Sequence, residues 1–166
     1  MGEDQAAPHL ADLFPASAAA GAALRAHGWT VAVGESCTGG LLGAVLTAVP
    51  GSSAYVRGGV IAYDNALKTE LLGVDAELIV RHGAVSQEVG AAMARGARDH
   101  LGADVGIGVT GVAGPGSDGG KPAGMVFVAI ASPGGDRVVR LDGDRGREQN
   151  RANAVRTALE LLEDAS

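Results

Sequence analysis

The chain has 166 residues, enough for one domain with a single core that needs no disulfide or metal to hold it together. Its composition is 46% hydrophobic but only 3% aromatic, with 27 glycines, so the core must be built from small aliphatic side chains with close backbone approaches. A net charge of −6 disfavours a general nucleic-acid binder, whose affinity would come from neutralising phosphates, but it leaves room for a small anionic ligand held by local positive charge.

The N-terminal segment mixes acids, alanines and prolines, so we expect residues 1–9 to be a flexible lead-in and residues 10–166 to form the domain. This segment lacks the basic start and apolar core of a secretion signal. No apolar run reaches the roughly 20 residues of a membrane span, and Cys37 has no partner for a disulfide. We therefore expect a soluble, cytoplasmic protein that does not bind a membrane.

Hydrophobic spacing and turn residues predict alternating helices and strands in the rest of the chain. The late hairpin must pair antiparallel, so we predict a single-domain α/β fold, layered α/β/α with a mixed sheet. Ser86 is the expected N-cap of a long helix. The expected strands are residues 29–33, 58–63, 104–110, 124–132 and 137–141, and the expected helices are residues 17–27, about 40–49, a short one from about 65, a second ending near 82, 87–101 and 148–162.

A serine and a lysine are the first candidate catalytic pair. Ser52 and Ser53 lie in a predicted turn, and the strand at 58–63 leads back towards them before Lys68 begins its helix. A lysine whose pKa is depressed by a desolvated site can take the proton of a serine, which makes a nucleophile without histidine. The alternative is an ordinary serine turn beside a solvent-facing lysine, since surface lysines are the rule.

The turn before the helix predicted at about 40–49 offers a rival nucleophile. Ser36, Cys37 and Thr38 precede two glycines at a helix start, where the helix dipole favours anions and lowers the pKa of a thiol. Cys37 is therefore either a reactive thiol or a small buried hydrophobe. No histidine is visibly tied to it, and the four histidines and one cysteine show no metal-ligand spacing, so we expect no metal.

Glycine-rich stretches and arginines supply the remaining candidates. Gly106, Gly108 and Gly111 match GxGxxG, but two of them lie inside a predicted strand and no helix follows, which disfavours a dinucleotide site. The loop 111–122 either binds a phosphate or carboxylate through free N–H groups and Lys121, or is a flexible surface connection. Most arginines of the C-terminal quarter are expected in solvated ion pairs, with one or two available to clamp a phosphate.

Several of these motifs occur together in one order: Glu35-Ser36-Cys37-Thr38-Gly39-Gly40, Gly51-Ser52-Ser53, Gly58-Gly59-Val60-Ile61-Ala62-Tyr63, Lys68, Thr110-Gly111-Val112-Ala113-Gly114-Pro115, Lys121-Pro122 and Gly143-Asp144-Arg145. Together they resemble the C-terminal domain family of the competence and damage-inducible protein CinA. The resemblance covers roughly residues 10–162 and is specific because the motifs share one order, although each alone would be weak.

The resemblance implies the fold of that domain and a stand-alone nicotinamide-nucleotide amidase, without the N-terminal nucleotide-processing domain of full CinA. Such an enzyme converts nicotinamide mononucleotide and water to nicotinate mononucleotide and ammonia in pyridine-nucleotide recycling for NAD metabolism. It implies a homodimer and no cofactor. The roles it carries over are Ser53 as nucleophile, Lys68 as base, Ser36 and Tyr63 as hydrogen-bonding supports, Thr110 beside the carboxamide, Arg145 on the nucleotide side, and Thr38, Gly39, Gly111, Gly114 and Lys121 as further substrate-binding residues.

One departure and one rival reading accompany this resemblance. The segment after Gly143-Asp144-Arg145 is about two residues longer than the usual pattern, so Arg147 or Arg151 could fill the role given to Arg145. The rival class is a non-catalytic nucleotide- or partner-binding domain linked to competence or the DNA damage response. Its signature would be loss of Ser53, Tyr63 or Lys68, and all three are present.

Overall fold

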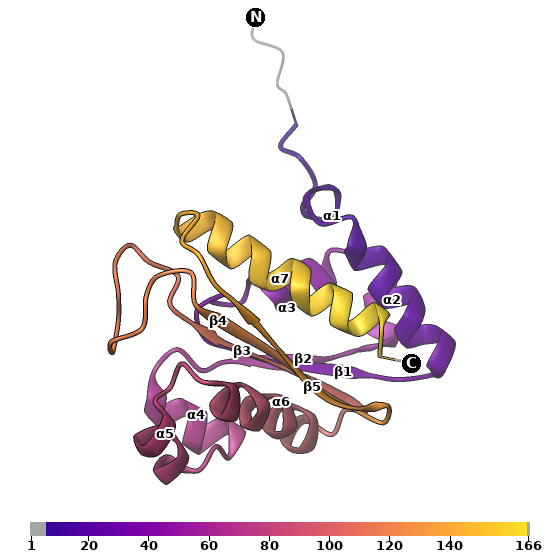
Figure 1. The fold of residues 1–166 in the computed structure, drawn as a ribbon. Helices are drawn as coiled ribbons and strands as arrows, with labels where there is room; N and C mark the ends of the chain where they lie inside the picture. Colours follow the sequence, from indigo (N-terminus) through magenta and orange to yellow (C-terminus); the bar gives the residue numbers. More distant parts are fainter. Residues whose placement is uncertain (1–5, 166) are drawn as a thin grey trace, which may run out of the picture.

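The computed structural model describes residues 6–165 and is built around one mixed β-sheet (Figure 1). The sheet has five strands in the order β2-β1-β3-β4-β5. β1 pairs parallel with β2 and β3, and β4 pairs antiparallel with β3 and β5, so the predicted mixed sheet is confirmed. The strands are β1 Val31–Glu35, β2 Val56–Ile61, β3 Val105–Gly111, β4 Val126–Ser132 and β5 Gly135–Leu141.

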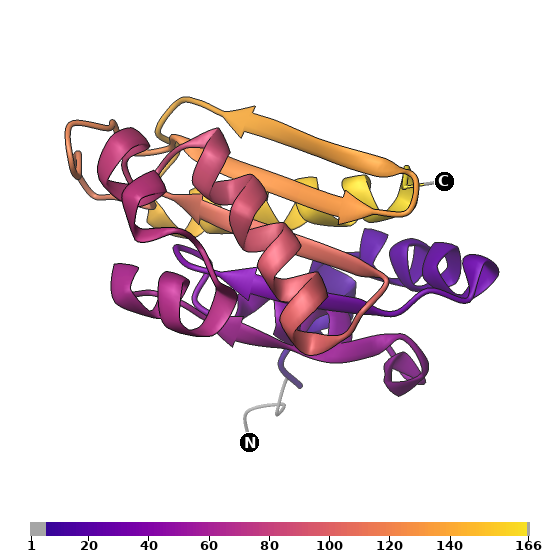
Figure 2. The same cartoon turned by 90° about the horizontal axis from the view of Figure 1, so that it is seen from below.

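Helices cover both faces of the sheet, as the predicted α/β/α layering requires. In Figures 1 and 2, α2, α3 and α7 lie over one face, and α4, α5 and α6 lie over the other. One apolar cluster lies beneath each group of helices, built mainly from Ala, Val, Leu and Ile. The helices are α1 Leu10–Leu13, α2 Ala16–His27, α3 Leu41–Thr47, α4 Asn65–Leu72, α5 Ala76–His82, α6 Gln87–Leu101 and α7 Arg147–Glu163, and a 3-10 turn, η1, spans Ser52–Ala54.

The local signals in the sequence locate most elements to within two residues. Ser86 caps α6 as predicted, because its Oγ accepts a hydrogen bond from Val89 N. The strand predicted at 29–33 instead begins at Val31, since the ring of Trp29 stacks on His27 outside the sheet. The short helix α1 was not predicted. Of the predicted lead-in, residues 1–5 lie outside the described part of the chain.

The GxGxxG pattern serves helix–sheet packing. α6 lies directly on β3, and a Cβ on Gly106 would collide with the backbone of Ala94 in α6. A Cβ on Gly108 would collide with the backbone of Gly90 in the same way. These two glycines therefore let the helix backbone approach the strand to a distance that any larger residue would prevent.

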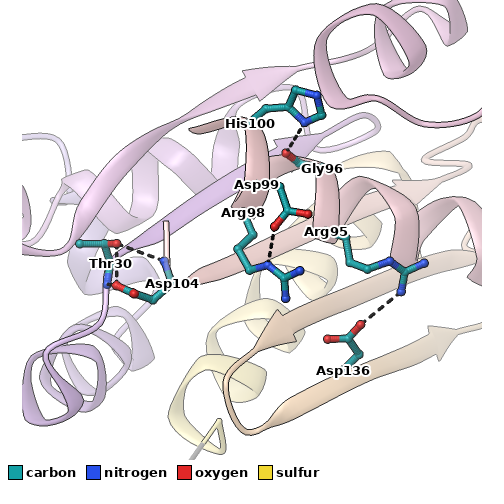
Figure 3. A network of polar contacts seen from close by, with 8 residues as sticks. All are labelled: Thr30, Arg95, Gly96, Arg98, Asp99, His100, Asp104 and Asp136. Atoms are coloured by element: carbon teal, nitrogen blue, oxygen red, sulfur yellow. Dashed lines mark hydrogen bonds and ion pairs between the residues drawn. The ribbon is translucent and has the colours of Figure 1, made fainter. Parts of the chain in front are cut away.

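Polar contacts fasten the end of the sheet where the parallel strands begin (Figure 3). Thr30 precedes β1, and its N and Oγ1 donate to Asp104 Oδ2, just before β3, over 2.8 and 2.9 Å. Arg95 on α6 pairs with Asp136 on β5 at 3.2 Å. Loops that follow β1, β2 and β3 lie at the opposite end of the sheet. Within residues 6–165, no helix combines the length and apolar character of a membrane span.

Candidate functional site

A pocket of about 200 Å³ opens at the carboxyl ends of β1, β2 and β3. The chain leaves β1 through α3 on one face of the sheet and leaves β2 through α4, α5 and α6 on the other. Such a change of side produces a crevice beyond the strand ends, which is where open α/β sheets bind ligands. The pocket is lined by Ser36, Cys37, Tyr63, Asn65, Lys68, Ala84, Val85, residues 110–118 and Arg147.

Lys68 extends from α4 into the pocket and is only 1% exposed. Its Nζ donates to Ser36 Oγ at 3.1 Å and to the carbonyl of Ala62 at 2.9 Å, with weaker contacts to Tyr63 O and Asn65 Oδ1. Burial lowers the pKa of Lys68, and the charge of Asp64 offsets part of this effect. The amine is therefore within reach of a serine hydroxyl in a setting that favours its neutral form.

The backbone holds Ser36 at this position. Ser36 follows the last residue of β1, and its N–H donates to Val109 O on β3 at 2.9 Å. Gly39 and Gly40 then adopt φ values of 60° and 96°, a left-handed conformation that lets the chain turn sharply into α3. Within the part of the chain that the structure describes, no backbone carbonyl accepts a hydrogen bond from the N–H of Cys37 or Thr38.

The structure does not bring Ser53 and Lys68, the predicted catalytic pair, together. Ser53 is an exposed residue of η1, before β2, and Val56 of β2 pairs with Val31 at the start of β1. Ser36 follows the other end of β1, so about 15 Å of strand separates the two serines. Because β2 runs parallel to β1, it carries the chain away from the serine turn and delivers Lys68 to the end where Ser36 lies.

Four of the other predicted residues do line the pocket: Tyr63, Thr110, Gly111 and Gly114. Thr110 is buried, and its Oγ1 donates to Ala84 O at 2.7 Å, which ties β3 to the segment before α6. Tyr63 is 59% exposed and stands at the pocket mouth. These residues come from two different strand ends, so the pocket depends on the sheet to assemble it.

The remaining predicted residues lie outside the pocket lining. Thr38 is fully buried, and its carbonyl accepts from Arg151 Nη2 at 3.0 Å beside Gly39. Lys121 and Arg145 line two other hollows of the surface. None of these residues lines the pocket together with Ser36 and Lys68.

Arg147 is the arginine that the structure brings to the pocket. As the first residue of α7, it donates through Nη1 to Gly114 O and through Nη2 to Tyr63 Oη at 3.3 Å. No carboxylate among the described residues pairs with its guanidinium. The sequence did contain a signal for Arg147. The segment after Gly143-Asp144-Arg145 is about two residues longer than the usual pattern, so an arginine other than Arg145 could fill its role.

Cys37 lines the pocket, but its surroundings disfavour the thiolate form of its side chain. Only 6% of it is exposed, and burial raises the pKa of its thiol to about 12. The thiolate is the reactive form of cysteine, so little of it exists near neutral pH. The buried-hydrophobe interpretation of Cys37 fits this environment.

Sequence reasoning missed Asn150, which ties the pocket loop to α7. The side chain is buried, and its Nδ2 donates to Ala113 O at 3.0 Å and to Asp144 Oδ1 at 2.9 Å. Its Oδ1 accepts from Arg145 N at 3.0 Å. The available signal was a polar amide among the apolar positions of an amphipathic helix.

Comparison with known proteins gives a consistent set of matches. The chain matches the CinA C-terminal domain over residues 14–166. A CinA-like protein of Gloeobacter violaceus is 50% identical over 155 residues, which are 92% of this chain and 36% of that protein. A CinA-like protein of Parasynechococcus marenigrum is 54% identical over 146 residues, 85% of this chain and 34% of that protein. This chain therefore spans about a third of the length of these relatives.

Solved structures with the same fold match this chain over nearly the whole length of both chains. The competence/damage-inducible protein CihA from Agrobacterium tumefaciens superposes with a TM-score of 0.87 at 38% identity, over 93% of this chain and 95% of that one. A CinA superfamily protein from Escherichia coli superposes with a TM-score of 0.86 at 32% identity, over 98% and 93% of the two chains. The fold is thus shared along almost the full domain.

Proposed function

The chain belongs to the CinA C-terminal domain family, and on that basis we propose that it is a nicotinamide-nucleotide amidase, which hydrolyses nicotinamide mononucleotide to nicotinate mononucleotide and ammonia. The observation that carries the proposal is the contact of 3.1 Å between Lys68 Nζ and Ser36 Oγ at the pocket. An amide is unreactive, so its hydrolysis at neutral pH needs an activated nucleophile and a proton donor for the leaving amine. A buried lysine beside a serine supplies both.

We assign the nucleophile to Ser36 and the base to Lys68. Neutral Lys68 removes the hydroxyl proton of Ser36 while Oγ bonds to the carboxamide carbon, and the C=O electron pair moves onto oxygen. The backbone N–H of Cys37, which lines the pocket, is suited to bind that oxyanion, because no backbone carbonyl of the described chain occupies it. The Lys68 ammonium then protonates the carboxamide nitrogen. The C–N bond breaks as the oxyanion forms C=O again, so ammonia departs and the acyl group remains bound to Ser36 as an ester.

Hydrolysis of the ester completes the cycle with the same two side chains. Lys68, neutral again after protonating ammonia, takes a proton from water as the water oxygen bonds to the ester carbon. The C–Oγ bond then breaks, and Ser36 recovers its proton from Lys68 as the acid departs. Tyr63 and Thr110 line the pocket, where they limit the space for the nicotinamide ring and its carboxamide.

We assign the phosphate of the substrate to Arg147, in the role that the resemblance gave to Arg145. The guanidinium lies at the pocket with carbonyl and hydroxyl partners and no carboxylate partner among the described residues. An arginine fork binds phosphate oxygens in a bidentate way and keeps its charge at any physiological pH. Arg147 therefore distinguishes the nucleotide from free nicotinamide.

The decisive experiment measures ammonia release from nicotinamide mononucleotide in the presence of a chelator. The wild type is compared with Ser36→Ala, Lys68→Met and Ser53→Ala, with circular dichroism to verify folding. We expect the first two variants to lose at least about a thousandfold in rate. Ser53→Ala is the matched control, because it removes a serine of a neighbouring motif that lies at the other end of β1.

Each other outcome has a definite meaning. Loss of activity in Ser53→Ala with activity retained in Ser36→Ala would reject our assignment of the nucleophile. A folded wild type that releases no ammonia would favour the non-catalytic binding domain. The homodimer and the cytoplasmic location expected from the resemblance and the sequence stay predictions.

A further inference from the structure

A carboxylate is buried directly beside the proposed nucleophile. Glu35 is the last residue of β1, immediately before Ser36, and it is 1% exposed. Among the described residues, no lysine, arginine or histidine forms an ion pair with it. Burial of an ion without a counter-charge is unfavourable unless hydrogen bonds replace its water shell. The position therefore requires an explanation.

Both carboxylate oxygens bind the beginning of α3. Oε1 accepts from Leu42 N at 2.9 Å, and Oε2 accepts from Gly43 N at 3.0 Å. These N–H groups belong to the first turn of α3, which has no intrahelical acceptors for them. The side chain of Glu35 thus joins the end of a strand to the start of the next helix.

The backbone of the same residues is fixed in the sheet. Glu35 O accepts from Ala62 N at 2.7 Å, and Ser36 N donates to Val109 O at 2.9 Å. The turn from Ser36 to Gly40 is therefore closed at both ends, by the sheet at its start and by the Glu35 carboxylate at its end. Within this closed turn lie the hydroxyl of Ser36 and the N–H groups of Cys37 and Thr38.

We infer that Glu35 is a positioning residue for the amide hydrolysis, because it fixes the turn that presents the Ser36 hydroxyl and the adjacent N–H of Cys37 to the substrate. This inference rests on the proposed function. Glu35 touches no reacting atom and acts only through the backbone that it holds. A displacement of about 1 Å in such a group is enough to reduce a rate about a hundredfold.

The two bonds explain why a carboxylate is needed here. A glutamine at this position keeps one oxygen acceptor, but its NH₂ group faces the second backbone N–H and repels it. An aspartate is shorter by one methylene and draws both oxygens back from α3. Replacement of Glu35 by Gln therefore loosens the turn while it preserves the volume of the side chain.

The test compares the steady-state constants of the wild type and Glu35→Gln. We expect kcat for nicotinamide mononucleotide to fall about 10- to 100-fold with KM within about threefold, because the turn supports the transition state more than it supports binding. Asp75→Asn is the matched control: Asp75 also caps a helix with its carboxylate, accepting from Glu77 N at 2.9 Å, but it is exposed and lies outside the pocket lining. Its constants should stay within about twofold, since asparagine is an equally good N-cap.

A purely structural role gives a different result. In that case Glu35→Gln would lower the melting temperature while kcat per folded molecule stayed at the wild-type value, and our inference would be overturned. If Glu35→Gln does not fold, Glu35→Asp takes its place, because it keeps the charge of the carboxylate but draws both oxygens back from the N–H groups of Leu42 and Gly43. The same loss of kcat is expected.

A second readout separates this inference from the amidase proposal. A fluorophosphonate probe reacts with an activated serine whatever the natural substrate, and Ser36→Ala gives the background. We expect labelling of Glu35→Gln to be at least about tenfold slower than labelling of the wild type. Labelling without ammonia release would reject only the amidase, equal labelling of both proteins would reject the role of Glu35, and a wild type that shows neither labelling nor ammonia release would reject both.

Discussion

Lys68 Nζ lies 3.1 Å from Ser36 Oγ, although 32 positions of sequence separate the two residues. The parallel register of β1 and β2 accounts for the contact. Glu35 pairs with Ile61, so the residues that follow both strands emerge side by side, and α4 then returns Lys68 towards β1. The pair is thus a consequence of strand order, and it exists only when the sheet has formed.

The activity should rise with pH as Lys68 loses its proton. Burial lowers the pKa of Lys68 below its ordinary value of 10.5, and only the neutral amine can accept the proton of Ser36. We therefore expect kcat/KM to increase through a pKa lower than that value and then to level off. A rate profile from about pH 5 to about pH 10 measures it. Lys68→Arg should be inactive throughout this range, because a guanidinium stays protonated; an active arginine variant would exclude lysine as the base.

Arg147 should control the affinity for the nucleotide. Arg147→Ala removes the cation that we assign to the substrate phosphate, so KM should rise about 10- to 100-fold with a smaller change in kcat. Arg145→Ala is the matched control, because Arg145 lines a different hollow beside α7. Initial rates over a range of nicotinamide mononucleotide concentrations give both constants. A larger effect at Arg145 than at Arg147 would reverse our assignment.

Cys37 should resist alkylation in the native protein. Its thiol is buried and its pKa is raised to about 12, so the reactive thiolate is rare at neutral pH. Iodoacetamide should leave both the mass and the ammonia release of the native protein unchanged. The same reagent should add one group after unfolding in guanidinium, since the chain has one cysteine. Rapid native labelling with loss of activity would restore Cys37 as a candidate nucleophile.

The comparison of sequence and structure shows which information is local. Caps, periodicity and glycine turns predicted α6 and the end of α2 because each depends on a few neighbouring residues. The sequence predicts Ser53 as the partner of Lys68, whereas the structure places Ser36 against the amine of Lys68. No local signal specifies that β1 lies between β2 and β3. Motif similarity supplied the pocket residues Tyr63 and Thr110, while their arrangement required the sheet topology.

Gly108→Ala should destabilise the fold. A Cβ at this position would collide with the backbone of Gly90, so α6 would have to move away from β3, at a loss of about 1–3 kcal/mol in the free energy of unfolding. Gly90→Ala is the matched control, because its Cβ would lie 3.4 Å from Phe127 Cβ, an ordinary contact, within a helix that favours alanine. Urea denaturation of both variants measures the difference. A stable Gly108→Ala would mean that α6 does not rest on the strand backbone.

The contact between Asp104 and Thr30 should make stability depend on pH (Figure 3). Hydrogen bonds from the N–H and hydroxyl of Thr30 hold the pKa of Asp104 below its ordinary value of 3.8. The folded state therefore has the lower pKa, so the stabilisation is complete above the ordinary value and is lost as pH falls through the folded value.

Asp104→Ala should accordingly lower the free energy of unfolding by about 1 kcal/mol at pH 7, a small value because the carboxylate is exposed. The difference from the wild type should shrink at about pH 3 and below. Asp142→Ala provides the comparison, since its partner Arg140 is close in sequence and both side chains are exposed; we expect less than about 0.5 kcal/mol. Urea titrations at the two pH values decide it, and an equal deficit at both would contradict the linkage.

The order of the pocket residues along the chain has a consequence for protein synthesis. Ser36 and Lys68 leave the ribosome before Arg147, which begins α7, the helix that packs on α2 and β4. A nascent chain therefore carries its serine and lysine well before it carries the residue that we assign to the phosphate. The proposed phosphate contact would be acquired only when α7 emerges and covers its face of the sheet, so a chain that is terminated before α7 would lack both that contact and a closed core.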